Sequence, residues 1–456
     1  MNQKHQNCLY QGKQQKKLRA AVSRWLLSSV GSLVFVASFS VQATSVLSTP
    51  LAEPLTYDEA VAIALGDNPS LAQIRSRYEA QSEVPSQVGT LPDPTISVNA
   101  MNFPTNSFDQ GQEAMTQVQI GFSQMFPFPG KLSLKKEAAE FEAVAAGHSV
   151  EEAKLQLRRN VTIKWWQVAY MDRAIKTIHR NQVLLRQFIT VARTKYETGK
   201  GLQQDVLLAQ LELSKLLDQE IQLNAMRRTQ AIALNVLMDR LPSIGIILPE
   251  KISTQMPSII DEEALGVLAG NERARLKQMQ AKVESAQARL KAAKRDYYPD
   301  FMVGMNYGDR SGSNPLPRGG GREDFASLMI GIKVPLYAKR KQARAVAQRN
   351  SEVDMSRHAL RNEKGNVLAQ VSIAVTDYQR AKEQFMLFES GIIPQAQQTV
   401  SSMLAGYQVN QVDFLNLVRS QITLFNYELQ YWKALSEANQ ALARLQAAVG
   451  KEPIYE

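Results

Sequence analysis

The stretch that decides the fold is KLSLKKEAAEFEAVAAGHSVEEAKLQLRRNVTIKWWQVAYMDRAIKTIHRNQVLLRQFITVARTKYETGK, residues 131–200. It is rich in strong helix formers, and no proline occurs between Pro129 and Pro242. A helix over 131–198 would be roughly 100 Å long at about 1.5 Å per residue. A second helix is predicted over about 203–238, after a glycine-containing turn. Helices of this length are rare in globular domains and predict a bundle or coiled-coil architecture.

Short segments of a different period interrupt the helical pattern. In each, apolar residues alternate with smaller or more polar ones, which predicts a strand with one apolar face. Their lengths approach those of strands that cross a membrane. Glycine-rich and polar segments between paired strands are typical of exposed loops. The four predicted strands lie at about 95–102, 117–126, 300–308 and 326–335.

The order of helices and strands occurs twice along the chain. Pro92-Asp93 precedes the first strand, and Pro299-Asp300 precedes the third, 207 residues later. Further matches are Ile120-Gly121 with Ile330-Gly331, at an offset of 210, and Tyr196, Gln210 and Leu213 with Tyr407, Gln421 and Leu424, at 211. Several ordered matches at a near-constant offset indicate a duplicated unit of about 200 residues. The predicted organisation is a first repeat over 44–238, a linker over 239–261, a second repeat over 262–450 with long helices at about 339–390 and 395–449, and a tail over 451–456.

The first 43 residues have the layout of a secretory signal peptide. A basic leader precedes an apolar run that ends in Val41-Gln42-Ala43, so cleavage is expected after Ala43. The alternative is a membrane anchor, but the run of about 16 residues is shorter than the roughly 20 that a span needs. This leader holds six lysines and arginines and no acidic residue, against a formal net charge of +10 for the whole chain. The remaining chain is only modestly basic, so we expect no nucleic-acid partner.

Most enzyme and metalloprotein classes find no support in the sequence. The single cysteine, Cys8, lies in the leader, which excludes a disulfide framework and a cysteine-based metal centre. There is no glycine-rich phosphate loop and no nucleophile elbow. The three histidines after the leader, His148, His179 and His358, lack the spacing of metal ligands. We therefore predict a non-enzymatic protein without a cofactor or a bound metal.

Four strands per chain cannot close a sheet on themselves, since small barrels need about eight. A sheet in lipid cannot leave its edges open. If the strands lie in a membrane, several chains must therefore contribute to one ring-shaped oligomer. The alternative is a small soluble sheet attached to a helical bundle.

Local motifs add a family resemblance over about residues 55–450. They are Leu55–Ala60 followed by Ala64-Leu65 and Asn68-Pro69, Tyr196-x2-Gly199 leading into Asp205–Gln210, and Pro394-Gln395-Ala396 followed by Tyr407 and Val412–Leu415. With the duplicated plan, the chain resembles the TolC-type outer-membrane efflux proteins of Gram-negative bacteria. The resemblance implies a mainly helical protein that forms a homotrimer. Its twelve pooled strands would form one barrel in outer-membrane lipid, and its helices a hollow cylinder in the periplasm. The implied partners are a periplasmic adaptor protein and an inner-membrane pump of the RND type.

The resemblance also implies where the channel closes. It places a gate at the periplasmic tips, formed here by Asp205, Tyr407, Asp413, Asn416 and Arg419, with a turn motif at Tyr196, Gly199, Gln210 and Gln421. Three positions depart from the best-known member. Val412 stands at a gate arginine, and Asn416 and Arg419 stand at carboxylates of a constricting acidic ring, for which Asp413 is a local replacement. The alternative for these residues is ordinary helix-turn chemistry, such as capping by Asp205.

The substrate is expected from a narrower resemblance. The run Ser123–Lys131, SQMFPFPGK, is similar to members that serve heavy-metal (cobalt–zinc–cadmium or copper) efflux. The function so implied is that of a passive exit duct for heavy-metal cations. The alternatives are an exit duct for drug efflux or type I protein secretion, and a soluble periplasmic coiled-coil adaptor.

Overall fold

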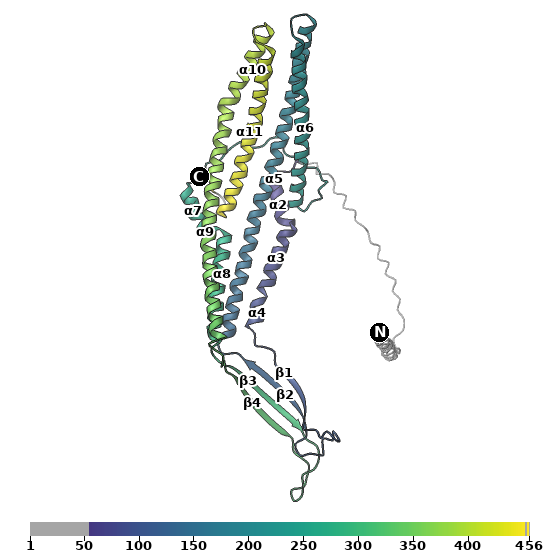
Figure 1. Cartoon of the computed structure of the whole chain (residues 1–456), viewed down its shortest axis with the longest axis vertical. Helices are drawn as coiled ribbons and strands as arrows, with labels where there is room; N and C mark the ends of the chain where they lie inside the picture. Colours follow the sequence, from purple (N-terminus) through teal and green to yellow (C-terminus); the bar gives the residue numbers. More distant parts are fainter. Residues whose placement is uncertain (1–53, 452–453, 456) are drawn as a thin grey trace, which may run out of the picture. The chain divides into compact units, whose positions relative to one another are not determined.

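The computed structural model describes residues 54–451 and 454–455. The predicted signal peptide over 1–43 lies outside the described residues. The first repeat contains α2 (Tyr57–Asp67), α3 (Pro69–Ser82), α4 (Val84–Gly89), β1 (Thr95–Met101), β2 (Gln117–Phe126), α5 (Lys131–Glu197) and α6 (Gln203–Leu237). The second contains α7 (Glu262–Glu272), α8 (Ala274–Arg295), β3 (Asp300–Asp309), β4 (Phe325–Lys333), α9 (Gln342–Leu387), the π-helical turn η1 (Phe388–Ile392), α10 (Ile393–Gln408) and α11 (Phe414–Val449). The order of elements is thus the same in both halves of the chain (Figure 1).

The four strands form one antiparallel sheet in the order β1-β2-β3-β4. The predicted alternation is present, because the most exposed apolar side chains of β1 and β4 share one face: Ile96, Val98, Leu328, Ile330 and Ile332. Val98 is 70% exposed and Ile330 is 68% exposed. The middle pairing, between β2 and β3, joins the first repeat to the second, and places Phe122 opposite Met305.

The two hairpins are equivalent residue by residue. Val98 pairs with Ile120 in the first hairpin, and Met305 pairs with Leu328 in the second. These pairs superpose when β1 is shifted by 207 residues onto β3 and β2 by 208 onto β4. The same 208 residues separate Pro127 from Pro335, just beyond the strands. With the first strands offset by 207, the predicted match of Ile120-Gly121 with Ile330-Gly331, at 210, would slip the second hairpin by two residues, so these two predicted offsets do not hold together.

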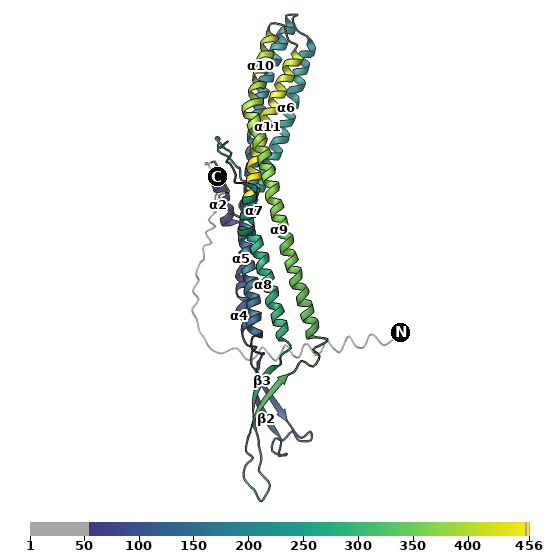
Figure 2. The ribbon, with the colours of Figure 1, turned by 90° about the vertical axis from the view of Figure 1, so that its left-hand side faces the viewer.

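The helices carry most of the buried residues. Two apolar clusters lie within the repeats, around Trp165 in the first and Tyr378 in the second. A third cluster joins α5, α6, α10 and α11 toward the turns that end α5 and α10, and includes Phe188 and Phe414. Figures 1 and 2 show α5 running beside α6 and α11. The long first helix is present as predicted, and its 67 residues span roughly 100 Å.

The helices of the second repeat divide differently from the prediction. Helices were expected over about 339–390 and 395–449, but the structure continues the first through 390–395 and separates α10 from α11 by a turn at 409–413. Pro394 does not break the helix, because it follows η1, whose wider turn suits a residue that cannot donate a backbone hydrogen bond. Together α9, η1 and α10 are the counterpart of α5. The helix predicted from 339 begins at Gln342.

A buried lysine connects the helices to the sheet. Lys131, the first residue of α5, is 6% exposed. Its Nζ atom lies 2.8 Å from Oδ1 of Asp300, at the start of β3, and donates to the carbonyl of Tyr298 at 3.0 Å. This contact ties the first repeat to the second where helices and strands meet. Over the part of the chain that the structure describes, no helix is both long and apolar enough to cross a membrane.

Candidate functional site

The two turns at the far ends of the long helices have the same backbone conformation. After α5, Gly199 takes a φ of +71°, and after α10 its counterpart Asn410 takes +58°. The next residue then donates a backbone hydrogen bond to the carbonyl five positions earlier in both turns. Lys200 donates to Lys195 at 2.8 Å, and Gln411 donates to Gly406 at 2.9 Å. Glycine and asparagine are the residues that tolerate this left-handed conformation best. The predicted turn motif is therefore a structural one at Gly199.

One lysine links the two turns. Lys195, in the last turn of α5, donates a hydrogen bond to the backbone carbonyl of Tyr407, and another to Oδ1 of Asn410 at 2.7 Å. Its Nζ atom also lies 4.0 Å from the centroid of the Tyr407 ring. A single cation thus binds the end of α10 by a carbonyl, an amide oxygen and a ring face. We call these three residues the tip clasp.

Tyr407 lies in the third apolar cluster. It is 5% exposed, and its ring centroid is 5.2 Å from that of Phe414. Burial raises the pKa of its hydroxyl, and the charge of Asp205 raises it further. Among the described residues this buried hydroxyl oxygen has no hydrogen-bond partner. Tyr407 therefore acts through its ring and its carbonyl, which hold the clasp lysine.

Asp205 faces the clasp from α6. It lies in the first turn of that helix and is half-buried. The pKa of its carboxyl is raised, mainly by burial and also by the charge of Asp413. A hydrogen bond from the backbone of Leu202 and the charge of Lys195 lower the pKa, but by less. The Leu202 contact is one that a capping carboxylate makes, so the capping alternative has support. The same carboxyl also faces an acidic residue of the other turn, so the electrostatics of the two turns are coupled.

The remaining predicted gate residues are on the surface. Asp413 is the N-cap residue of α11 and is exposed, as are Asn416 and Arg419. Asn416 is the counterpart of Asp205. The backbone N–H of Asn416 donates to the carbonyl of Asp413 at 3.1 Å, and the backbone N–H of Asp205 donates to the carbonyl of Leu202 at 3.2 Å. Within residues 54–451 the side chain of Arg419 makes no hydrogen bond or ion pair. The charge of Asp205 thus acts on both Tyr407 and Asp413 beside the tip clasp, whereas Asn416 and Arg419 lie on the exposed surface.

The turn-motif residues occupy different environments in the two repeats. Tyr196 is 48% exposed, whereas its counterpart Tyr407 is buried. Gln210 is exposed, whereas Gln421 is buried and donates to Oδ1 of Asn181 at 2.8 Å. The two turns therefore have the same backbone conformation, but the side chains at matched positions make different contacts.

Sequence reasoning did not single out Lys195. The residue directly precedes the Tyr196 motif, and a positive charge at that place is the signal that could have found it. At the position predicted to lack a gate cation, Val412 lies against Gly406, where an added Cβ would come within 2.6 Å of its Cγ2. The cation that bridges the turns thus comes from the first repeat.

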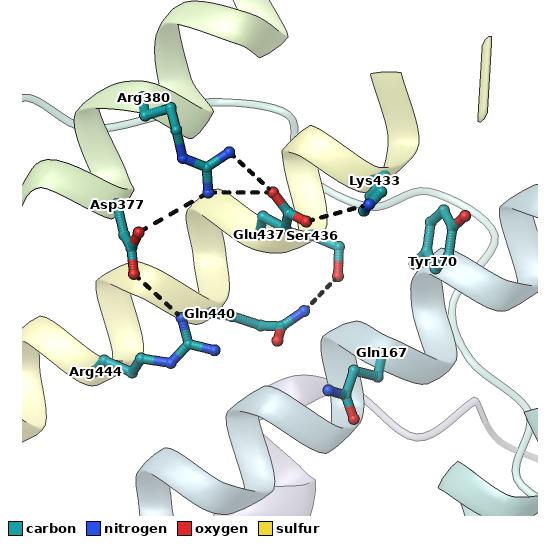
Figure 3. Close-up of a pocket in the computed structure, with 9 residues that line it drawn as sticks. All are labelled: Gln167, Tyr170, Asp377, Arg380, Lys433, Ser436, Glu437, Gln440 and Arg444. Carbon is teal, nitrogen blue, oxygen red and sulfur yellow. Dashed lines mark hydrogen bonds and ion pairs between the residues drawn. The ribbon is translucent and has the colours of Figure 1, made fainter. Parts of the chain in front are cut away.

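A second polar cluster lies farther from the turns. A cavity of about 320 Å³ between α5, α9 and α11 contains a chain of ion pairs (Figure 3). Arg380 bridges Asp377 at 3.9 Å and Glu437 at 3.4 Å, and the chain continues to Arg444 at 3.8 Å and Lys433 at 3.8 Å. All five side chains are at least a third exposed, and such pairs each stabilise by about 0–1 kcal/mol. The cluster holds α9 against α11.

No group of three or more histidine, cysteine or acidic side chains is arranged to hold a metal ion among residues 54–451 and 454–455.

Comparisons with known proteins agree with this architecture. The sequence model of the family described as outer membrane efflux protein matches residues 60–239 and 265–451. Among solved structures, VceC of Vibrio cholerae is 18% identical, with a TM-score of 0.73 over 86% of this chain and 96% of that chain. The open state of the Neisseria gonorrhoeae channel MtrE is 14% identical (TM-score 0.72, 86% and 88% covered), and CusC is 13% identical (TM-score 0.71, 86% and 91% covered). Likeness at these identities concerns the fold. No curated protein matches the sequence.

Proposed function

Because the chain belongs to the outer membrane efflux protein family, we propose that it is the exit duct of a tripartite efflux system. It is an outer-membrane channel whose helical part extends into the periplasm, and it is not an enzyme. Substrate passes through it passively after delivery from the inner membrane. The soluble adaptor considered above is set aside, because the family is one of channels.

The working form in this proposal is a homotrimer. One chain supplies four strands, and within the described residues β1 and β4 each have one unpaired edge. Three chains would pool twelve strands, enough to close a sheet in lipid without open edges. The exposed apolar face that carries Val98 and Ile330 suits contact with outer-membrane lipid.

The proposed partners meet the helical end. The turns at 198–202 and 409–413 lie at the opposite end of the long helices from the sheet, since α5 and the continuous helix made of α9, η1 and α10 each run without a break from the sheet to a turn. With the sheet in the outer membrane, these turns point toward the inner membrane. A periplasmic adaptor and an inner-membrane pump of the RND type would engage the channel there.

The observation that supports a gate at this end is the tip clasp. Lys195 links the two turns within one chain, and Asp205 and Asp413 bring two acidic groups beside it. Opening the channel requires the turns to move, and the contacts of Lys195 oppose that movement. In this proposal Lys195 supplies the link that a cation at Val412 would have supplied.

The proposed substrates are heavy-metal cations. The support is the run Ser123–Lys131, which resembles members of metal-efflux systems. The identities of 13% to 18% with VceC, MtrE and CusC do not separate one substrate class from another. Drug efflux and type I protein secretion remain the competing roles.

A deletion strain tests the role and the substrate together. The strain, with and without the gene on a plasmid, is grown on graded zinc, cadmium, cobalt and copper salts, dyes and antibiotics, and its secreted proteins are compared. The proposal expects metal sensitivity that the plasmid reverses. Sensitivity to dyes and antibiotics alone would assign the chain to drug efflux, and loss of one secreted protein would assign it to secretion. No change in any of these would contradict the exit-duct role.

A further inference from the structure

Methionine is unevenly distributed between the two faces of the sheet. The face opposite the exposed apolar one consists mostly of small and polar residues, as in the row Ser97, Gly121 and Asn306 that the register aligns across β1, β2 and β3. On the apolar face of the four strands, Met305 is the single methionine. The other four strand methionines lie on the polar face: Met101, Met125, Met302 and Met329. Every large aliphatic side chain on the polar face of the strands is therefore a thioether.

Three of these methionines are neighbours at the end of the sheet nearest the helices. The register places Met125 of β2 directly opposite Met302 of β3. Met302 is in turn opposite Gly331 of β4, and Met329 lies two residues earlier in that strand. Directly opposite residues on one face have Cβ atoms about 4.5–5.5 Å apart, and diagonal neighbours about 7–8 Å, which long side chains can span. We call Met125, Met302 and Met329 the thioether cluster.

Two glycines leave space for the cluster. A Cβ atom added at Gly331 would come within 3.2 Å of Cε of Met302, and one added at Gly304 would come within 3.2 Å of Cε of Met329. Met302 therefore extends over β4 and Met329 extends over β3, so these two side chains cross the same pair of strands in opposite directions. A larger residue at either glycine would displace the methyl group beside it. The cluster thus lies along the polar face, with Met125 37% exposed and Met329 41% exposed.

Packing alone does not explain why these side chains are methionine. Methionine fills irregular gaps in buried cores, but Met125 and Met329 are each more than a third exposed on a polar face. A thioether differs from an aliphatic side chain of the same size in its soft sulfur donor. Thioethers select Cu(I), whereas carboxylates and carbonyls suit harder cations. The chemistry of the cluster therefore fits a soft, singly charged metal ion.

The one carboxylate beside the cluster is already paired. Asp300, two residues before Met302 on the same face, lies 2.8 Å from Nζ of Lys131 and opposite Lys333 in the register. Two lysines thus compensate its charge. Among the residues that the structure describes, no group of histidine, cysteine or acidic side chains could hold a harder ion there. The site is neutral and rich in sulfur, which favours Cu(I) over zinc or cobalt.

We propose that the thioether cluster binds Cu(I), or the equally soft Ag(I), as the ion passes along the polar face of the sheet. The proposal rests on the exit duct proposed above, in which the apolar face contacts lipid and the polar face lines the duct. It narrows the substrate to soft monovalent metal ions. Conduction requires a site that an ion can both enter and leave, and three neutral ligands on an exposed surface meet that requirement.

Silver binding to the purified protein tests the cluster. Ag(I) is the probe, because it stays in one oxidation state in air. Titration calorimetry in detergent compares the wild type, the triple variant M125L/M302L/M329L and the control M305L, which removes a thioether from the opposite face of β3. Leucine keeps the aliphatic volume and removes the sulfur. We expect the wild type and M305L to bind alike and the triple variant to bind more than about tenfold more weakly, since losing even a hydrogen-bond partner of a metal ligand costs about that much.

X-ray absorption of the Cu(I)-loaded protein, prepared under a reductant, identifies the ligands. The wild type should show sulfur neighbours around copper, and the triple variant should not. Equal silver binding by the wild type and a folded triple variant, or a copper spectrum without sulfur, would overturn the proposal. If the triple variant does not fold, the single variants M125L and M329L at exposed positions replace it, and unchanged silver binding in both would overturn the proposal in the same way.

Growth and conductance separate the cluster from the duct. In the deletion strain, the triple variant should fail to restore tolerance to copper and silver, although its single-channel conductance in potassium chloride stays close to that of the wild type. Full restoration of copper and silver tolerance would overturn the cluster as a transit site and leave the exit duct standing. A protein that binds silver through the cluster but forms no channel would refute the exit duct, and with it the transit role.

Discussion

Lys195 donates a hydrogen bond to the backbone carbonyl of Tyr407 and places its charge 4.0 Å from the centroid of that ring. These two residues lie on helices from different repeats, at the ends farthest from the sheet. The contact joins the two helical hairpins of one chain without a carboxylate partner. It therefore links the turns even when nearby acidic groups are neutral.

Removing the clasp cation should loosen the tip in cells. Lys195→Ala loses the bonds to Tyr407 and Asn410, so the turns separate more easily. We expect cells carrying this variant to become sensitive to a large antibiotic that the outer membrane normally excludes. The matched control is Lys200→Ala, because Lys200 is exposed in the same turn and its side chain makes no hydrogen bond or ion pair within residues 54–451. Equal sensitivity of both variants, at equal protein levels, would argue against the clasp.

The raised pKa of Asp205 predicts a pH-dependent stability. Since the folded protein favours the protonated carboxyl relative to the unfolded chain, this group stabilises most at low pH, and that contribution is lost as pH rises through its folded pKa. Asp205→Asn should therefore raise the melting temperature at neutral pH. The gain should vanish below the ordinary aspartate pKa of about 3.9. A gain of the same size at every pH, or the same profile in the exposed-site control Asp239→Asn, would contradict this explanation.

Replacing Lys131, the buried lysine at the junction of the helices and the sheet, should lower the free energy of unfolding more than replacing an exposed lysine of the same helix. Lys131→Met leaves the carboxylate of Asp300 without its 2.8 Å partner and should cost about 3 kcal/mol, as expected when one member of a buried pair is removed. Lys135→Met, at an exposed position of the same helix, should change stability by less than about 0.5 kcal/mol. The measurement is denaturant unfolding in detergent. Adding Asp300→Asn to Lys131→Met should restore part of the loss, and no restoration would show that the pair is not the cause.

Arg419 tests whether the tip selects ions by charge. It is exposed and makes no side-chain bond within the described part of its own chain, so Arg419→Ala should leave the melting temperature nearly unchanged. If the residue lines the constriction, removing a positive charge should raise conductance and shift the reversal potential toward cations. An unchanged conductance and reversal potential for Arg419→Ala and also for Asp205→Ala would argue against a gate at these positions.

The sequence predicted the secondary structure that depends on local residue pattern. It did not predict the side-chain contacts that depend on residues far apart in the chain. The strands followed from alternation, and α5 followed from an uninterrupted run of helix formers. The helix boundary predicted between 390 and 395 was misplaced, because the proline there, Pro394, follows a π-helical turn and the helix continues through it to Gln408. Lys195 was missed because its partners lie 212 and 215 residues away in sequence. The different environments of Tyr196 and Tyr407 also depend on which helix covers each face, which an internal repeat alone does not reveal.

The most direct test of the central claim is single-channel recording of the purified protein in planar lipid bilayers. The wild type should insert as a discrete channel of low conductance, and Lys195→Ala should open to a severalfold higher conductance, with Lys200→Ala like the wild type. A wild type that forms no channel would contradict the exit-duct function. A Lys195→Ala conductance equal to that of the wild type would contradict a tip held closed by Lys195 and Tyr407.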